Sequence, residues 1–366
     1  MNFPYRCHFL IPLFLSTSAL SAVTAQETNL YVAGTKPLPP LPKGDGVFTL
    51  VIIPDTQSYR GRDCKQTPDS NDPVTNPNLE AQVKWIRDHR EDQRIVFISH
   101  VGDIVEKDRP EEWTIARQHL SMLLGVVPFS LTVGNHDMDN DGRAELFQQY
   151  FPASDFASYP WYLTSYSHTR KDQSVSANNV NSAQIFSAGG KDFLHLSLEC
   201  NAPDDVVSWA NTLLTKHADR RALITTHMDL GIIKKPKKED GYIIDPKGRM
   251  QWVKIHGKRG NTAEQLWDKL YRRHANIAFI FSGDQSRVTT LQEVRTGDHG
   301  NAVVSLLSDY LSLSVLRLMR FIPSANEVHV LSYDVTRRVL VEDTTYVHDL
   351  SRHQFTVPYP MTQASR

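Results

Sequence analysis

Polar residues that could bind metal ions follow five apolar segments of the sequence. These residues are Asp55, Gly102-Asp103, Gly134-Asn135-His136-Asp137, His227 and Gly283-Asp284, in chain order. Carboxylate, amide and imidazole groups are ligands for manganese, iron and zinc. Two such ions that share a carboxylate can hold the attacking and leaving oxygens of a phosphoryl transfer. The pattern therefore predicts a metal site built from residues far apart in the sequence.

Taken singly, each of these residues has an ordinary structural explanation. An aspartate after a strand usually belongs to a turn or a helix cap, and Gly134-Asn135 is typical of a turn. A lone histidine such as His227 is more often a hydrogen-bonded structural residue. The combination is more specific, because Gly-Asn-His-Asp and Gly-Asp each follow an apolar segment directly.

The apolar segments alternate with helical patterns along most of the chain. Strands are expected at 47–53, 95–98, 127–133, 222–226 and 277–282, and helices at 79–90, 110–124, 205–217 and 262–274. Such alternation favours a layered α/β fold, in which sites lie beyond the carboxyl ends of strands. Strand-like runs at 316–321, 328–333 and 339–342 are expected to pair antiparallel and complete a second sheet.

The chain is expected to contain four regions. Residues 1–25 resemble a secretory signal peptide, with a short apolar stretch and cleavage after Ala25. Residues 26–46 form a Pro-rich linker, residues 47–288 the main α/β domain, and residues 289–366 the C-terminal strands. The apolar stretch is too short to favour a membrane span. We therefore expect a secreted or periplasmic protein.

Composition narrows the choice of partners. The net charge of -1 over 366 residues shows no basic excess, so the sequence does not indicate a nucleic-acid partner. Cys64 and Cys200 remain after loss of the signal peptide, and either a disulfide or two free buried thiols is compatible with the sequence. The sequence gives no indication of oligomeric state.

The motifs resemble those of the calcineurin-like metallophosphoesterases over roughly residues 47 to 285. The resemblance implies two packed mixed β-sheets flanked by helices, and two divalent metal ions. It implies that Asp55 binds the first ion, that Asp103 bridges both, and that Asn135 and His227 bind the second. It also implies that His136, held by Asp137, binds the phosphate or protonates the leaving oxygen.

Two motifs depart from the family pattern. Gln57 stands where the family usually has histidine, and Gly283-Asp284-Gln285-Ser286 replaces Gly-His-x-His. Gln57 and Asp284 still offer oxygen atoms, so we expect them to complete the first and second ion sites. The oxygen-rich ligand set favours manganese or magnesium over zinc. His299 could replace a missing ligand, although a solvated loop histidine is the more ordinary interpretation.

The predicted function is hydrolysis of phosphate mono- or diesters on a small phosphorylated substrate by a metal-bound hydroxide. One alternative is a non-catalytic relative that binds a phosphorylated ligand or partner, since Gln57, Asp284 and Ser286 depart from the family pattern. A third possibility is a mononuclear enzyme that retains weak diesterase activity. The basic segment 231–260, which contains Lys234, Lys235 and Lys254, follows His227 directly. It is either a lid that attracts anionic substrates or a solvated charged loop.

Overall fold

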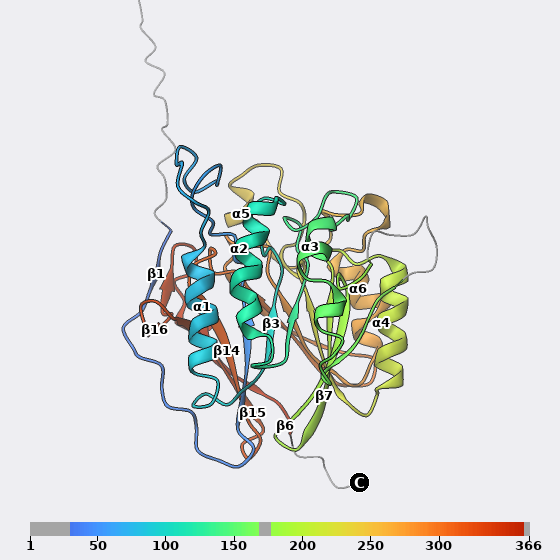
Figure 1. Ribbon diagram of the computed structural model, residues 1–366. Coiled ribbons are helices and arrows are strands. Elements are labelled where there is room, and N and C mark those ends of the chain that lie inside the picture. The colour runs from blue at the N-terminus through green and yellow to red at the C-terminus, as the bar shows by residue number, and fades with distance from the viewer. Residues whose placement is uncertain (1–29, 168–176, 362–366) are drawn as a thin grey trace, which may run out of the picture.

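The computed structural model describes residues 30–167 and 177–361. The signal peptide expected at 1–25 lies outside these residues. Two large mixed β-sheets pack face to face, and helices cover their outer faces (Figure 1). This arrangement confirms the expected fold class of two packed mixed sheets flanked by helices.

The first sheet has the strand order β16-β15-β14-β2-β3-β4, with β18 also paired to β15. Strands β2, β3 and β4 run parallel, and β14 and β15 are antiparallel additions. The bounds are β2 Phe48–Ile53, β3 Ile95–His100, β4 Phe129–Leu131, β14 Val315–Ile322, β15 Glu327–Asp334, β16 Val339–Leu340 and β18 Gln354–Pro358. Helices α1 (Pro77–Asp88) and α2 (Pro110–Leu120) follow β2 and β3 and pack against this sheet.

The second sheet has the order β12-β13-β11-β8-β7-β6-β5. Its four central strands β7, β8, β11 and β13 are parallel. The bounds are β5 Tyr162–Ser165, β6 Ser182–Ala188, β7 Lys191–Leu198, β8 Arg221–Thr226, β11 Ile277–Ser282, β12 Thr290–Thr296 and β13 Ala302–Ser308. Helices α4 (Asp204–Lys216) and α6 (Ala263–Lys269) pack on its outer face.

The C-terminal strands contribute to both sheets. Strands β12 and β13 extend the second sheet, whereas β14, β15 and β16 extend the sheet that contains β2. The runs at 316–342 therefore form strands as expected, but they do not complete the second sheet. The reason is that β14 pairs along β2 and occupies its free edge.

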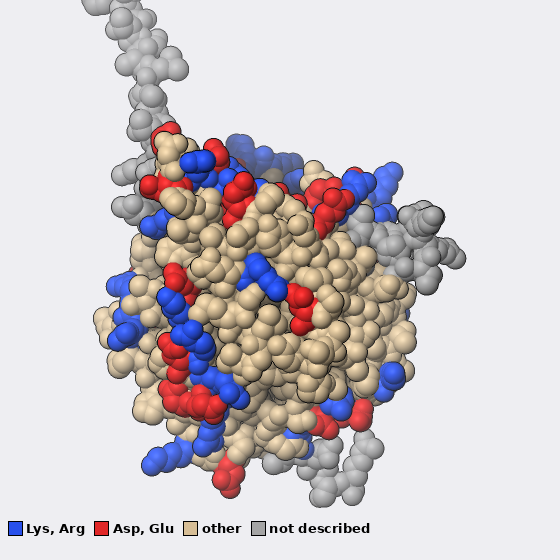
Figure 2. All heavy atoms as spheres, viewed as in Figure 1, with Lys and Arg blue, Asp and Glu red and all other residues tan. Residues whose placement is uncertain are grey.

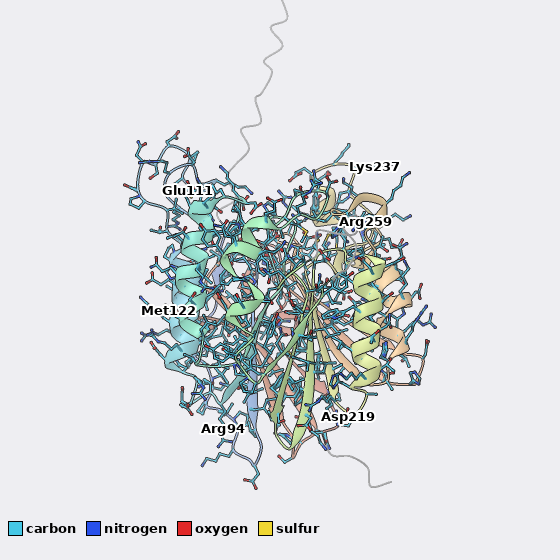
Figure 3. The ribbon with its side chains drawn as sticks, turned by 45° about the vertical axis from the view of Figure 1, so that its right-hand side comes forward. Arg94, Glu111, Met122, Asp219, Lys237 and Arg259 are labelled. Carbon is cyan, nitrogen blue, oxygen red and sulfur yellow. The ribbon has the colours of Figure 1, made fainter. Side chains whose placement is uncertain are left out.

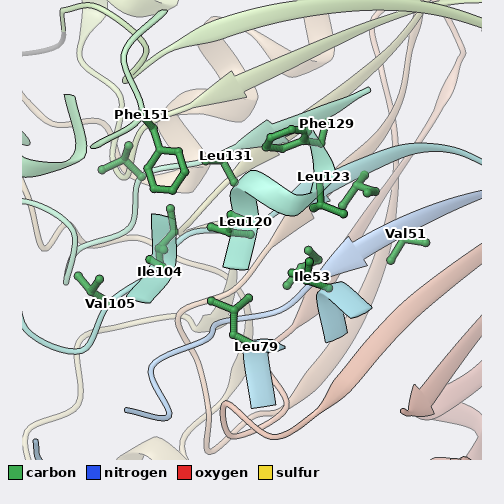
Figure 4. Packing of buried hydrophobic residues seen from close by; sticks show 14 of the residues in the cluster. Val51, Ile53, Leu79, Ile104, Val105, Leu120, Leu123, Phe129, Leu131 and Phe151 are labelled. Atoms are coloured by element: carbon green, nitrogen blue, oxygen red, sulfur yellow. The ribbon is translucent and has the colours of Figure 1, made fainter. Parts of the chain in front are cut away.

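Alternation of side chains along β2 explains why the whole strand is buried. Leu50 and Ile52 belong to the core between the sheets, whereas Val51 and Ile53 face the helices. Figure 4 shows Ile53 near Leu79 of α1, with Val51 farther along the strand. A parallel strand covered on both faces needs such a continuous apolar run.

The residues before the first sheet strand run along this body. Strand β1 (Val32–Ala33) pairs with β17 (Asp343–Thr344), and the carbonyl of Pro40 accepts a hydrogen bond from Arg320 (3.3 Å). Among the helices of the described residues, none has the length and apolar character that a membrane crossing requires. On the face drawn in Figure 2, positive and negative side chains are interspersed, in keeping with the net charge of -1.

The parallel strands of the two sheets end at the same side of the molecule. In Figure 3, Arg94 and Asp219, which precede β3 and β8, lie at one end of the molecule. Glu111 in α2, together with Lys237 and Arg259 in segment 231–260, lies at the other end. The carboxyl ends of the strands therefore point toward segment 231–260.

Candidate metal centre and active site

Three of the predicted ligands converge at this end of the strands. Asp55 follows β2, Asp103 lies beyond β3, and His227 follows β8 directly. All three are buried, and one ligand atom from each lies within 4.8 Å of the others. The two sheets thus contribute side chains to one polar cluster, as the spacing of the motifs predicted.

Glycines beside these ligands permit the close approach. A Cβ atom at Gly134 would collide with Asp103, and one at Gly283 would collide with the carboxylate of Asp55. Gly102 has a φ of 102°, a conformation that side chains disfavour. The Gly-Asp and Gly-Asn pairs of the sequence are therefore a packing requirement of the cluster.

His227 presents a lone pair to the cluster. Its Nδ1 lies 2.9 Å from the carbonyl oxygen of Val101 and must donate to it, which leaves Nε2 as an acceptor in the neutral ring. Nε2 lies 3.1 Å from Asp103 Oδ1 and 3.5 Å from Asp284 Oδ1. Burial would lower the pKa of His227, but the charge of Asp103 and the contacts with both carboxylates raise it well above its usual value. An acceptor that faces two carboxylates needs either a proton or a cation between them.

The carboxylates show the same shortage of positive charge. Asp55 Oδ1 is buried and has no hydrogen-bond partner among the described residues, and burial together with the charge of Asp309 raises the pKa of Asp55. Burial, Asp103 and Asp284 raise the pKa of Asp309 to about 7. Buried carboxylates are normally paired or bound to a metal. The donor set of Asp55, Asp103 and His227 therefore fits one divalent cation.

Gln57 contacts the cluster through its amide nitrogen. Gln57 Nε2 donates to Asp103 Oδ2 (2.9 Å), and the backbone N–H of His136 donates to Asp103 Oδ1 (2.9 Å). Burial would raise the pKa of Asp103, but the neighbouring His227 holds it below the usual range. The predicted role of Gln57 as an oxygen ligand would require its amide group to turn over.

His136 and Asp137 have separate tasks. Asp137 is buried, and its two oxygens accept hydrogen bonds from the backbone N–H groups of Val105 (3.0 Å) and Gly134 (2.8 Å). The His136 ring is instead fixed by the carbonyl of Glu106, 2.8 Å from Nδ1. The expectation that Asp137 holds His136 is corrected by these contacts, because Asp137 holds the loops together.

Asn135 and Asp284, the other two predicted ligands, contact a lysine. Lys254 Nζ forms an ion pair with Asp284 Oδ1 and donates to Asn135 Oδ1 (3.2 Å). Burial would lower the pKa of Lys254, but the charges of Asp284 and Asp103 raise it. Burial would raise the pKa of Asp284, and the charge of Lys254 lowers it. The oxygens expected to bind the second ion are therefore engaged by an ammonium group.

A polar pocket opens above the cluster, and segment 231–260 covers part of it. The pocket lining includes the acidic residues of the cluster, His136 on the rim, and three positively charged side chains. The full lining is Asp55, Gln57, Lys65, Asp103, His136, Glu239, Tyr242, Lys254, Asp284, Gln285, Ser286, Arg287 and Asp309. Glu239 pairs with Arg287 (2.5 Å), whose guanidinium lies 5.5 Å from the Tyr242 ring centre. Lys234 and Lys235 are exposed and do not line the pocket. Segment 231–260 thus overhangs the site through residues other than this pair.

Two residues of the site were not predicted from the sequence. Asp309 follows β13, which runs parallel beside β11. Its position directly after an apolar strand could therefore have identified it as a residue of the site. Lys254 gave no such signal, because it was one of many cations in a basic segment.

His299 is exposed, lies 3.0 Å from the carbonyl oxygen of Arg273, and does not line the pocket. Cys64 and Cys200 are both free and buried, so the two-thiol alternative holds.

The fold and this cluster define an α/β sandwich protein with a candidate metal centre at its strand ends. The family model for calcineurin-like phosphoesterases matches residues 48–288, and the chain belongs to this family.

Individual relatives are distant. The chain is 24% identical over 335 residues to the uncharacterized protein YvnB of Bacillus subtilis (strain 168), a match that covers 88% of this chain and 22% of that protein. The chain thus spans about a fifth of the length of this curated relative. Among solved structures it is similar to a 5'-nucleotidase precursor from Thermus thermophilus (TM-score 0.41, 12% identity, covering 81% of this chain and 53% of that one). It is also similar to the NAD nucleotidase of Haemophilus influenzae (TM-score 0.42, 11% identity, covering 79% and 47%).

Proposed function

We propose that this protein hydrolyses phosphate monoesters or diesters with a divalent cation held by Asp55, Asp103 and His227. The observation that carries the proposal is the convergence of these three buried side chains, within 4.8 Å of one another, in a pocket rimmed by His136. Membership of the calcineurin-like phosphoesterase family supports the same chemistry. The oxygen-rich donor set favours manganese or magnesium.

Each part of the pocket has a role in this reaction. When bound, a divalent cation lowers the pKa of water and provides a nucleophile near neutral pH. Lys65 and Arg287 lie on the pocket wall, where they attract the phosphate. The side chain of His136 is 36% exposed. Because its Nδ1 is bound to the Glu106 carbonyl, Nε2 is left to bind phosphate or pass a proton to the leaving oxygen.

The test is hydrolysis of p-nitrophenyl phosphate and of bis(p-nitrophenyl) phosphate with added manganese, which separates monoesterase from diesterase activity. Asp103→Asn should lose bound manganese and lower kcat by at least about a hundredfold, because it removes a charge that faces both the cation and His227. Asp141→Asn is the matched control, since Asp141 is exposed and outside the pocket. Full activity in Asp103→Asn would refute the assignment.

The contacts of Asn135, Asp284 and Gln57 favour a second candidate, a non-catalytic protein that binds phosphate. Two of the expected ligands contact Lys254, and Gln57 presents its amide nitrogen. Such a protein would bind inorganic phosphate in a calorimetric titration and would show neither manganese binding nor turnover. This combined result would select the binding protein over the enzyme.

We also propose that the substrate is a small phosphorylated molecule and that the protein acts outside the cytoplasm. The location rests on the residues 1–25, which have the charge and hydropathy pattern of a signal peptide. Expression of the full chain in a bacterial host, followed by N-terminal sequencing of the exported protein, tests this. A mature protein should begin at Gln26, and a cytoplasmic protein that begins at Met1 would contradict the proposal.

A further inference from the structure

Lys254 occupies an unusual position for a lysine. Its ammonium group contacts Asp284 Oδ1 and Asn135 Oδ1 at the floor of the pocket. The side chain of Lys254 is 26% exposed, whereas that of Asp284 is fully buried. An ammonium group has three N–H donors. Two of them are used by Asp284 and Asn135, and the third is available to a molecule in the pocket.

The backbone of Lys254 is fixed by a buried asparagine. Asn201 Oδ1 accepts hydrogen bonds from the N–H groups of Lys254 (2.9 Å) and Ile255 (3.3 Å). Asn201 Nδ2 in turn donates to the carbonyl of Asn261 (3.0 Å). Asn201 adopts a left-handed backbone with a φ of 53°, which asparagine tolerates better than most residues. Lys254 is therefore attached to the loop that follows β7.

The segment that carries Lys254 has two further anchors. Arg249, at the end of β10 (Lys247–Arg249), pairs with the buried Asp229 and donates to Ser305 Oγ (2.9 Å). The indole N–H of Trp252 donates to the carbonyl of Ile232 (2.9 Å). The Arg249 contacts tie the segment to the second sheet, the Trp252 bond closes the segment onto its own strand β9 (Leu230–Ile232), and Asn201 holds it at Lys254 itself. These contacts hold the Lys254 side chain in the pocket.

The chemistry of its neighbours suggests what Lys254 does. Asn135 and Asp284 are the residues expected to bind a second metal ion in this family pattern. An ion bound to both of their oxygens would lie within contact distance of Nζ, where two positive charges repel each other strongly. A lysine ammonium supplies a point charge and hydrogen bonds to phosphate oxygens.

We propose that the ammonium group of Lys254 takes the place of the second cation, so that the site holds one metal ion and Lys254 binds the phosphate. Asp55, Asp103 and His227 would hold the single ion. The phosphate-binding part rests on the proposed function, whereas the number of bound ions does not.

The decisive measurement is the number of manganese ions bound by the full chain, from equilibrium dialysis with elemental analysis. Electron paramagnetic resonance distinguishes an isolated ion from a spin-coupled pair. The wild-type protein should bind one equivalent with the spectrum of an isolated ion. Lys254→Met, which keeps the aliphatic stem but removes the charge, should bind two equivalents as a coupled pair. Lys254→Arg and the exposed control Lys258→Met should bind one.

Several outcomes would overturn the proposal. A wild-type protein with two equivalents or none contradicts it directly, and this count decides the question if Lys254→Met does not fold. A folded Lys254→Met that still binds one equivalent also contradicts it. Failure of the proposed function looks different, because a wild-type protein with one ion and no turnover would refute hydrolysis while leaving the ion count intact. A wild-type protein that binds two ions and turns over substrate would refute the ion count while leaving hydrolysis intact.

Discussion

The buried imidazole of His195 should make the protein lose stability in acid. His195 lies in β7, with Nδ1 2.9 Å from Gln184 Oε1 and Nε2 2.8 Å from Thr225 Oγ1. The neutral ring with its proton on Nδ1 satisfies both contacts, since Nε2 then accepts from the Thr225 hydroxyl. Ser99 of the other sheet lies 3.3 Å from the same Nε2. Burial between the sheets lowers the pKa of His195 to about 3.

The size of the effect follows from proton linkage. In the unfolded chain the pKa of His195 returns to about 6.5. The unfolded chain therefore binds more protons than the folded protein between pH 6.5 and pH 3. The contribution of His195 to the stability of the folded protein is therefore fully present above pH 6.5 and is lost as the pH falls through this window. Between pH 7 and pH 5 this group alone should lower the free energy of unfolding by about 2 kcal/mol.

Urea unfolding of the wild-type protein and His195→Gln at pH 7 and pH 5 measures this loss. The glutamine keeps polar atoms in the buried site but does not titrate. The variant should therefore lose about 2 kcal/mol less between the two pH values than the wild type does. His299→Gln, at an exposed loop position, should keep the wild-type dependence. The other titrating groups contribute equally to all three proteins, so equal losses in wild type and His195→Gln would refute the reasoning.

Three further predictions concern the pocket and its cover. Arg249→Met should lower the free energy of unfolding by about 3–5 kcal/mol, because it leaves the buried Asp229 without its partner. Chemical denaturation measures this loss, and the double variant with Asp229→Asn should regain much of the lost stability. Asp309→Asn should weaken manganese binding about ten- to a hundredfold in a titration, because Asp309 adds negative charge beside Asp55, and unchanged affinity would exclude that role. Reversing the charges of Lys234 and Lys235 together should leave KM for p-nitrophenyl phosphate within about twofold at physiological salt, because both are exposed and screened; a large rise in KM would show that they do steer the substrate.

The elements most accurately predicted are those whose burial is uniform. The run of apolar residues at 277–282 coincides with β11, and the predicted strand at 222–226 begins one residue after β8. Both strands are central in the second sheet and covered on both faces, which leaves little room for polar residues. A strand that is buried on both faces is therefore visible in the sequence as a continuous apolar run.

The hairpin of β6 and β7 was missed for the opposite reason. Ser182, Gln184, His195 and Ser197 are buried there and interrupt the buried apolar residues of the hairpin, such as Phe193 and Leu196. These polar groups satisfy one another and the neighbouring sheet, as the bonds of His195 show. Such pairing depends on tertiary contacts, so a single sequence does not show that these polar positions are buried.

The residues of the candidate metal centre were predictable because each follows a strand, but the role of Asp137 and the place of Lys254 were not. Asp137 was expected to orient His136, yet its carboxylate bonds the backbone of two loops that meet only in the folded protein. Lys254 is 119 residues from Asn135 in the chain, and the folding of segment 231–260 brings them together. A lysine carries no positional signal when its segment holds many others.

The altered last motif and Lys254 are best explained as one electrostatic unit. A histidine at position 284 would be a neutral ligand, whereas Asp284 adds a negative charge to a pocket that already contains Asp55, Asp103 and Asp309. A further buried carboxylate is costly unless it is paired, and Lys254 forms an ion pair with it. Lys254, in turn, would lack this anionic partner opposite a neutral, metal-bound imidazole. A site that had simply lost its second ion would need neither the added carboxylate nor a lysine held in place by Asn201. The pair therefore indicates a site in which a cation has been exchanged rather than removed.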